Sequence, residues 1–472
     1  MGNRTMNDLN AVVKEVYIEG LNGKKYPLTG SKPAAQIESI RIYEGIDMPT
    51  IAAELTLIDT ATNLIATAPI VGTEKVVMKI VVPAISKTEY KYEFVIYGIR
   101  SRIVSKNAQQ YILDLFTLEA LKNEVLRIGK KIEGTADVIV KDILTNYLEA
   151  NSKIKSSNFE TCQYKIKEIP SMKRPFDMIA SLLPECVSSS ATPQQQAAAS
   201  RTSGTTTSGS LKSDVPDTTK VISGTAGYMF FETYDGYVFK SIDKLVSDPE
   251  KHREYAYSIA QTEESKTENN TYKILNYSFG SQENILQKMR FGVYASTIAF
   301  FNPSTLEYEE YKFSLEKEYQ QMRHLGTDEK IPDQIKNFSQ YPSRVMLQFY
   351  DHETFHSGIG VADPSQTSGG QATPYPDFKK QWMAQSISRS MIIKNQILNI
   401  TIPLNLELRA GDKLKVKLPN QSLSSEREKE LYDKANSGVY LISKISYEVL
   451  RDANVGLVAV SNVELIRDNL GS

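Results

Sequence analysis

Cysteine, tryptophan and net charge are all scarce in this sequence of 472 residues. It contains two cysteines, Cys162 and Cys186, and one tryptophan. The cysteines lack metal-ligand spacing and nothing else indicates an oxidising compartment, so we expect a structural thiol pair, with a disulfide as the alternative. The 55 Lys and Arg balance the 56 Asp and Glu. Because a polyanion is bound by clustered positive charge, this balance argues against specific nucleic-acid binding.

Long apolar runs are missing as well. The N-terminus, MGNRTMNDLNAVVKEV, has no apolar core of a signal peptide. No stretch approaches the ~18 apolar residues of a membrane span. We therefore expect a soluble protein that is not secreted through a signal peptide and has no membrane partner.

Large apolar side chains are almost absent from residues 188–220, SSSATPQQQAAASRTSGTTTSGSLKSDVPDTTK. Such a segment contributes little to a core and is predicted to be disordered. Because an aromatic strand pattern resumes directly after it, we interpret the segment as a loop inserted within one domain.

Alternating apolar and polar residues predict strands on both sides of a helical region. The N-terminal strands are predicted at 37–46, 52–60, 74–84, 90–104 and 108–118. The strictest alternation, Lys413 to Leu418, puts three lysines on one face and three aliphatic residues on the other. Helical spacing replaces this pattern in residues 136–148, after Pro175, and from about 377 to 394.

These patterns predict an α+β chain that is mainly β, with two antiparallel β-barrel domains, an α/β domain and an inserted subdomain. The predicted divisions are residues 1–120 for the first barrel, 121–269 for the α/β domain with its disordered loop 188–220, 270–309 and 376–472 for the second barrel, and 310–375 for the insert.

Two motifs are candidates for catalytic sites. His352-Glu353-Thr354-Phe355-His356 fits the H-E-x-x-H pattern, in which His352 and His356 would bind zinc from one helix face. The motif follows a predicted strand and precedes Ser-Gly, which leaves about one helical turn, so a polar turn is favoured. Glu309 and Glu310 are adjacent on a predicted strand and should point to opposite faces, unlike a glycosidase pair. We therefore predict no catalytic residue, no metal and no cofactor.

The stretch GYMFFETYDGYVFKSIDKL, residues 227–245, contains six aromatic residues. Asp235-Gly236 predicts a hairpin with a type I′ turn, which would place Phe231 on the same face as Tyr237 and Phe239. An exposed row of rings could stack on sugars, as in an adhesin. Aromatic cross-strand pairs also stabilise ordinary hairpins, so we favour a scaffold role.

The aromatic stretch, PYPDFKKQWMAQSISRSMIIKNQILNITIPLNLELRAGDKLKVKLP and GVYLISKISYEVL resemble baseplate hub proteins of contractile-tailed bacteriophages. Similar domains occur in the spike proteins of type VI secretion systems. The resemblance covers residues 35–185 and 225–468, including the order of two β-rich domains around an α/β unit. The loop at 188–220 departs from it.

The resemblance implies a structural virion protein, not an enzyme. Three copies would form a ring in which two homologous tail-tube-like barrels per copy give pseudo-sixfold symmetry. This homotrimer would join the sixfold tail tube protein to the threefold central spike protein and contact baseplate wedge proteins, after assembly in the host cytoplasm. Lys413, Lys415 and Lys417 are predicted to line part of the inner surface. The alternatives are a tail-associated zinc hydrolase or a carbohydrate-binding tail adhesin.

Overall fold

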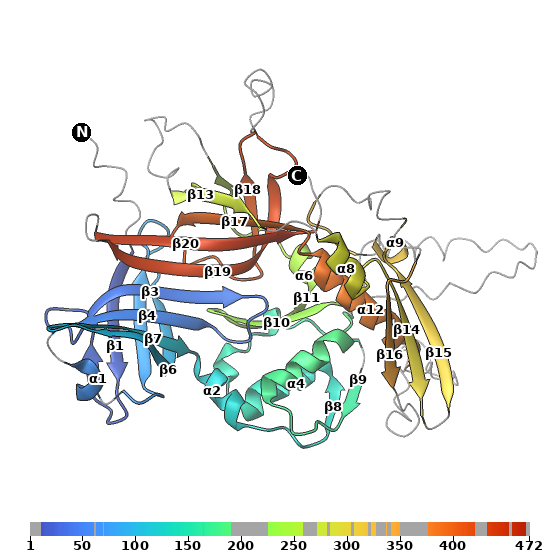
Figure 1. Cartoon of the computed structure of the whole chain (residues 1–472), viewed down its shortest axis with the longest axis horizontal. Helices are drawn as coiled ribbons and strands as arrows, with labels where there is room; N and C mark the ends of the chain where they lie inside the picture. The colour runs from blue at the N-terminus through green and yellow to red at the C-terminus, as the bar shows by residue number, and fades with distance from the viewer. Residues whose placement is uncertain are drawn as a thin grey trace, which may run out of the picture.

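Figure 1 shows the arrangement of the elements in the computed structural model of the chain. The residues that the structure describes are 11–60, 63–68, 70–163, 165–189, 225–257, 271–280, 284–303, 306–319, 322–326, 337, 341–349, 376–420, 432–452 and 456–468. The predicted loop therefore lies outside the described residues, apart from its first two positions.

Strands dominate the chain, as predicted. They are β1 (Val12–Glu19), β2 (Lys25–Pro27), β3 (Gln36–Gly45), β4 (Ala52–Asp59), β5 (Lys75–Val81), β6 (Tyr90–Val104), β7 (Gln109–Phe116), β8 (Ile132–Thr135), β9 (Lys165–Glu168), β10 (Tyr228–Thr233), β11 (Gly236–Ser241), β12 (Tyr255–Ala256), β13 (Asn276–Phe279), β14 (Ala295–Asn302), β15 (Glu307–Ser314), β16 (Arg344–Phe349), β17 (Gln396–Pro403), β18 (Lys413–Lys417), β19 (Gly438–Asp452) and β20 (Gly456–Arg467).

The described residues also form α-helices. They are α1 (Leu64–Thr67), α2 (Leu118–Val125), α3 (Ala136–Asp142), α4 (Pro175–Leu182), α6 (Ile242–Ser247), α8 (Ile285–Phe291), α9 (Leu315–Glu318) and α12 (Pro376–Ile392). Single turns of 3-10 or π geometry add η2 (Ile143–Tyr147), η3 (Asn151–Lys153), η4 (Ser156–Asn158) and η5 (Leu183–Glu185). The helices predicted at 136–148, after Pro175 and near 377–394 are confirmed by α3 with η2, by α4 and by α12.

Thirteen strands form one large sheet, in the order β13-β17-β20-β19-β3-β4-β7-β6-β5-β1-β2, with β18 and β12 joined beside β19. The two β-rich regions meet where β19 pairs antiparallel with β3, from Lys444 opposite Gly45 to Leu450 opposite Ser39. The mainly β class is confirmed, but two separate barrels are not. The edges of β3 and β19 satisfy each other's backbone groups, and no pairing among the described strands closes either region into a barrel.

The alternation read from the sequence produces the two faces of this sheet. On β17, Ile400 and Ile402 are buried whereas Asn399 and Thr401 are half-exposed. On β18, Leu414 and Val416 join the same core, and the lysines alternate with them. One face of the sheet therefore packs on a continuous hydrophobic core, and the other is polar.

The α/β unit lies beside the sheet and holds the hairpin of β10 and β11 (Figure 1). Its core joins α3, α4 and the hairpin rings, and it includes both cysteines. Both are free thiols, and the Cys186 thiol donates to the Leu182 carbonyl oxygen at 3.1 Å. Burial raises the pKa of Cys186, which keeps this thiol protonated. The expected structural thiols are confirmed.

A third unit contains the three-stranded sheet β15-β14-β16, covered on one face by α12 (Figure 1). Its core includes Ile298 and Phe300 of β14, Phe313 of β15 and Ala384 of α12. The boundary predicted at residue 310 therefore falls inside β15, and β14 lies in this small sheet rather than in the large one. The division into domains as a whole stays a prediction.

Candidate functional site

The residues predicted as possible catalytic groups do not form a site in the described part of the chain. His352 and His356 lie outside the described residues, so neither the favoured polar turn nor the zinc alternative is tested there. Glu310 follows Glu309 on β15, as predicted, and accepts a hydrogen bond from the Tyr308 hydroxyl at 2.7 Å. Within the described ranges, no group of three or more His, Cys, Asp or Glu is arranged to hold a metal ion, and no helix is long and apolar enough to cross a membrane.

The aromatic hairpin is confirmed, but its turn differs from the prediction. Thr233 pairs with Gly236, so Tyr234 and Asp235 occupy the turn, and neither has a positive φ. The turn is therefore not type I′. Gly236 has a φ of +118° instead, and a Cβ there would overlap the backbone carbonyl of Lys153. The glycine is required by this close approach, a contact that local sequence does not reveal.

The shifted turn also changes the faces. Phe230 pairs with Phe239 and stacks on Tyr237 with ring centroids 5.4 Å apart, whereas Phe231 packs on the opposite face. Tyr228 and these four rings are all buried. The scaffold interpretation is confirmed, and the exposed platform that sugar stacking needs is not formed by these five rings.

Buried carboxylates attach this hairpin to its neighbours. Glu232 accepts hydrogen bonds from the Ile51 amide at 2.9 Å, the Thr117 hydroxyl at 2.8 Å and the Lys153 ammonium at 2.6 Å. These partners belong to the first strand region and to the α/β unit. The hairpin therefore fixes these two parts of the molecule relative to each other.

Glu44 of β3 holds the tip of the hairpin. Its carboxyl accepts from the Tyr234 amide at 2.9 Å and from the Ala410 amide at 3.4 Å. Arg409 lies over the Tyr90 and Tyr234 rings, with its guanidinium carbon 5.5 and 4.9 Å from their centroids. Burial raises the pKa of Glu44 from 4.5 to about 7, although the nearby Arg409 charge opposes this rise.

This raised pKa predicts a pH dependence of stability. Because the folded pKa lies above the unfolded one, the stabilisation is complete below pH 4.5 and is lost as the pH rises through about 7. Between pH 5 and pH 8, wild type should lose about 2–3 kcal/mol of unfolding free energy relative to Glu44→Gln, which cannot ionise. Urea unfolding at both pH values measures this difference. Equal losses in the two proteins would contradict the assignment.

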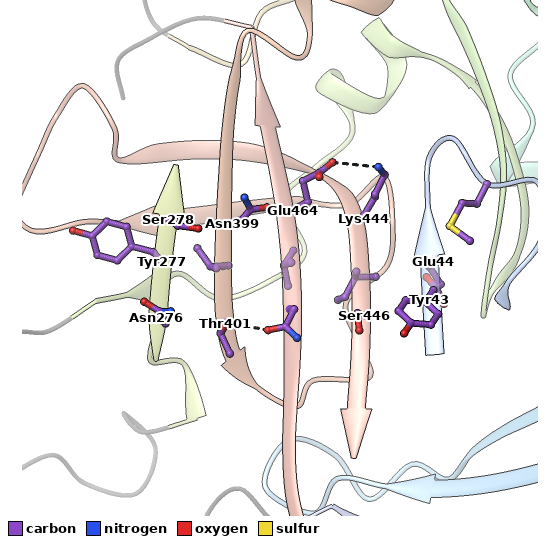
Figure 2. A pocket seen from close by; sticks show the side chains of 15 residues that line it. Tyr43, Glu44, Asn276, Tyr277, Ser278, Asn399, Thr401, Lys444, Ser446 and Glu464 are labelled. Atoms are coloured by element: carbon purple, nitrogen blue, oxygen red, sulfur yellow. Dashed lines mark hydrogen bonds and ion pairs between the residues drawn. The ribbon is translucent and has the colours of Figure 1, made fainter. Parts of the chain in front are cut away.

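The most extended surface feature is a polar face on the large sheet. It is formed by the side chains that point away from the core on the adjacent strands β13, β17, β20, β19, β3, β4 and β7 and on the end of β6. One row crosses five strands in register, Asn276–Thr401–Asn462–Ser446–Tyr43. Thr401 donates to the Asn462 side chain at 2.8 Å. The side chains of this row line a groove of about 320 Å³. Figure 2 labels four of them, Asn276, Thr401, Ser446 and Tyr43.

Charged residues on the polar face are paired with their neighbours. Arg41 lies 3.6 Å from Glu54 and 3.8 Å from Glu448 on the two flanking strands. Arg100 binds Asp114 at 2.7 Å and also contacts Glu54. Lys444 and Glu464 form a similar cross-strand pair, drawn as a dashed line in Figure 2. Opposite charges at short range cancel locally, so the face is hydrophilic without a strong field of either sign.

This arrangement presents hydrogen-bonding groups along the whole polar face. A catalytic site typically brings together groups with strongly shifted pKa values in one cleft. Glu44, which has such a pKa, borders the groove but directs its carboxyl to Tyr234 and Ala410. The amides, hydroxyls and ion pairs of the face offer hydrogen bonds to a molecule that lies against it.

The lysines of β18 are held by neighbouring groups. Lys415 and Lys417 lie 3.5 and 2.6 Å from Glu254, and Lys413 donates to the Val246 carbonyl oxygen at 3.0 Å. Their alternation with buried residues is confirmed, while a place on the inner surface of a ring stays a prediction. The polar face was not predicted from the sequence. In the sequence, the sign of this face is a polar residue at every second position of each strand. The strand order, which brings these residues together, cannot be read from local sequence.

Comparison with known proteins gives similarities to solved structures. No protein-family model matches the sequence. No curated protein matches it either. The tail protein from Neisseria meningitidis MC58 is 10% identical, with a TM-score of 0.48 over 96% of both chains. The 43 kDa tail protein of prophage MuSo2 from Shewanella oneidensis is 9% identical, with a TM-score of 0.48 over 98% of this chain and 100% of that one. The E. coli c3393 protein, a component of the type VI secretion system, is 9% identical, with a TM-score of 0.40 over 96% of this chain and 76% of that one. Tail proteins and a secretion component are therefore among the solved structures that this chain is similar to.

Proposed function

We propose that this chain is a structural protein of a phage tail baseplate, a trimeric hub whose ring joins a sixfold tail tube to a threefold central spike. The observation that carries the proposal is the polar face, which runs without interruption from the strands of one β-rich region to those of the other. A ring that surrounds a channel needs such a continuous hydrophilic lining on one side and a core on the other.

The joined β-rich regions support the proposed symmetry. Each copy contributes two adjacent regions of the sheet, so three copies would present six around the axis. This repetition fits a sixfold tube on one side, while the three copies fit a threefold spike on the other. The partners would be the tail tube protein, the central spike protein and baseplate wedge proteins, in the virion after assembly in the host cytoplasm.

The protein would act through shape and interfaces, without enzymatic activity. The locally cancelled charges of the polar face fit this role, because a strong field of one sign would hold a charged polymer in place. We therefore also propose that the polar face lines the channel.

The mass of the native complex tests the trimer. We expect native mass spectrometry of the full chain to give three times the monomer mass of 53.0 kDa, and negative-stain images to show rings. Spectra at several protein concentrations separate a specific trimer from random association. A monomer at every concentration, with or without a spike protein, would contradict the hub proposal.

A further inference from the structure

Positive charge is concentrated on one two-stranded ribbon of the α/β unit. β8 pairs antiparallel with β9 over four residue pairs. The same two segments meet again beyond the strands, where the Ile128 amide donates to the Lys173 carbonyl oxygen at 2.9 Å. We call residues 127–135 and 165–174 the basic ribbon, because they contain seven Lys and Arg but only two Glu. In a chain whose net charge is −1, this is a strong local excess of one sign.

One face of the basic ribbon packs on the core of the α/β unit, and the other is open to solvent. Ile132 and Ile166 belong to that core. Successive side chains of a strand alternate between its faces, so Lys165, Lys167 and Ile169 point away from the core in one row. Lys165 is exposed, Lys167 is half-exposed and Ile169 is 64% exposed. We call these three residues the outward row.

The two carboxylates of the basic ribbon are engaged by other lysines. Glu133 lies opposite Lys167 in the register, but its carboxylate is 2.6 Å from Lys131. The second carboxylate, that of Glu168, is 3.1 Å from Lys173. Within the described ranges, no ion pair includes either lysine of the outward row. The outward row therefore offers two positive charges to a partner, beside an exposed apolar side chain.

The basic ribbon also has strand edges that could accept another strand. Among the described strands, β8 and β9 pair only with each other, so each has an edge that no described strand covers. An added strand bonds to such an edge through its backbone, while its alternate side chains contact those of the neighbouring strand. The lysines of β9 repel a second lysine-rich edge, which makes another copy of this ribbon a poor occupant.

We propose that the edge of β9 binds an extended acidic segment of another protein as a third strand of the ribbon. Charge complementarity identifies the occupant: carboxylates at two alternate positions would lie beside Lys165 and Lys167, and an apolar side chain would cover Ile169. Side chains of neighbouring strands are about 4.5–5.5 Å apart, close enough for ion pairs. Nucleic acid or anionic lipid would use the charge alone and leave the strand edge unpaired. The inference concerns the α/β unit and does not depend on the proposed trimer.

A synthetic strand tests the proposal on the full chain. The probe is a short fluorescein-labelled peptide in which one valine and two glutamates alternate with threonine, and fluorescence anisotropy measures its binding. With glutamines in place of the glutamates, we expect binding to weaken at least about tenfold. A version with N-methylated backbone amides keeps both charges but cannot donate to the edge, and it should bind equally weakly. No binding of the glutamate peptide, or equal binding of the N-methylated one, would overturn the inference.

Charge reversal on the protein shows where the peptide binds. Lys165→Glu/Lys167→Glu should lose the glutamate peptide and instead bind a peptide with lysines at the same two positions. Lys87→Glu/Lys106→Glu is the matched control, because these two lysines are exposed outside the α/β unit and the change in net charge is the same. Thermal unfolding verifies that both variants are folded. If the two variants bind the glutamate peptide equally well, the outward row is not the site and the inference is wrong.

Competition separates a polypeptide from other anions. Unlabelled glutamate peptide should displace the probe from wild type, whereas a thymidine oligonucleotide or phosphatidylglycerol vesicles at the same concentration of negative charge should not. Displacement by all three alike would make the basic ribbon a general site for anions and would contradict strand addition. Each of these negative results leaves the hub proposal standing, because the mass of the native complex tests that proposal separately.

Discussion

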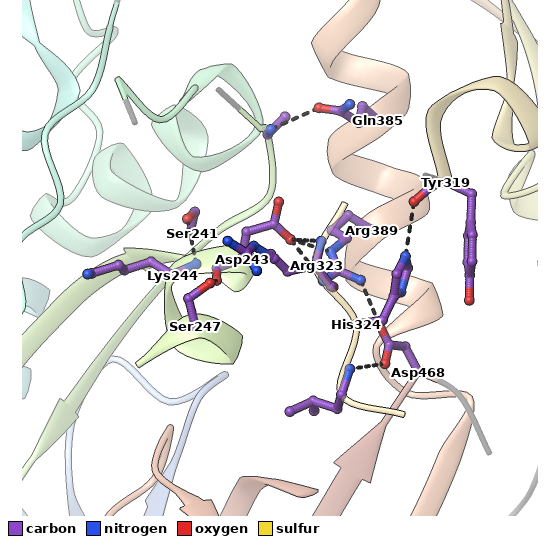
Figure 3. Close-up of polar contacts among 12 residues, drawn as sticks. Ser241, Asp243, Lys244, Ser247, Tyr319, Arg323, His324, Gln385, Arg389 and Asp468 are labelled. Carbon is purple, nitrogen blue, oxygen red and sulfur yellow. Dashed lines mark hydrogen bonds and ion pairs between the residues drawn. The ribbon is translucent and has the colours of Figure 1, made fainter. Parts of the chain in front are cut away.

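Replacing Arg389 by methionine is expected to destabilise the protein by about 3–5 kcal/mol, since it removes one partner from a buried set of charges. The Arg389 side chain is 1% exposed. Its guanidinium lies 2.9 Å from Asp243 and 3.0 Å from Asp468, and it also donates to the Arg323 carbonyl (Figure 3). Without the arginine, two carboxylates would stay buried with only part of their hydrogen bonds.

The position of these charges explains the size of the effect. Asp243 belongs to α6, Arg389 to α12, and Asp468 directly follows β20. His324 bonds to Asp468 at 2.7 Å and to the Tyr319 carbonyl at 3.0 Å, so the segment after α9 is attached as well. Burial by itself would raise the pKa of Asp468, but the His324 hydrogen bond and the Arg389 charge outweigh burial and hold that pKa at about 2.

Chemical denaturation monitored by circular dichroism measures the loss. Arg290→Met is the matched control: this arginine is exposed on α8, so its replacement should change the unfolding free energy by less than about 0.5 kcal/mol. If both variants unfold at the same denaturant concentration, the buried cluster does not stabilise the fold in the way that we infer.

Gly236→Ala is expected to cost about 2–5 kcal/mol, because backbone strain and a steric clash add at this position. The φ of +118° is unfavourable for alanine, and the new methyl group would overlap the Lys153 carbonyl. The clash is with backbone, so no side-chain rotation relieves it. The hairpin would have to move away from η3, and the Lys153–Glu232 ion pair at 2.6 Å would be strained.

Gly23→Ala separates the two causes. Gly23 also has a positive φ, +73°, but a Cβ there meets nothing within 4 Å. It should therefore show only the backbone strain, about 1 kcal/mol. Thermal unfolding of both variants gives the comparison. A Gly236→Ala protein as stable as Gly23→Ala would show that the contact with Lys153 can relax.

Local patterns in the sequence predicted the individual elements well. All five predicted N-terminal strands are present, because apolar and polar residues alternate with the period of a strand whose one face is buried. The helix after Pro175 begins at that residue, where the missing amide costs nothing. The lysine and aliphatic faces of β18 also follow directly from a period of two.

Contacts between distant segments could not be predicted in this way. The hairpin turn was predicted one residue too late in the sequence. Gly236 is needed for the close approach of the Lys153 backbone, more than eighty positions earlier, and not for the turn itself. The pairing of β3 with β19 depends on two edges that each look like an ordinary strand in sequence. The polar face could not be predicted for the same reason. Asn276, Thr401 and Tyr43 fall in one row across the sheet only when the strand order is known.

The pairing of β3 with β19 has a consequence for synthesis. Ser39 is made well before Leu450, its neighbour in the sheet. At a ribosomal rate of about 5–20 residues per second, the ~400 residues between them take about 20–80 s. For that time the nascent chain carries β3 with one edge unsatisfied, exposed to any other growing copy on the same messenger. A fragment that contains β3 but lacks β19 should therefore be prone to aggregate, because the later strand β19 covers the open edge of β3.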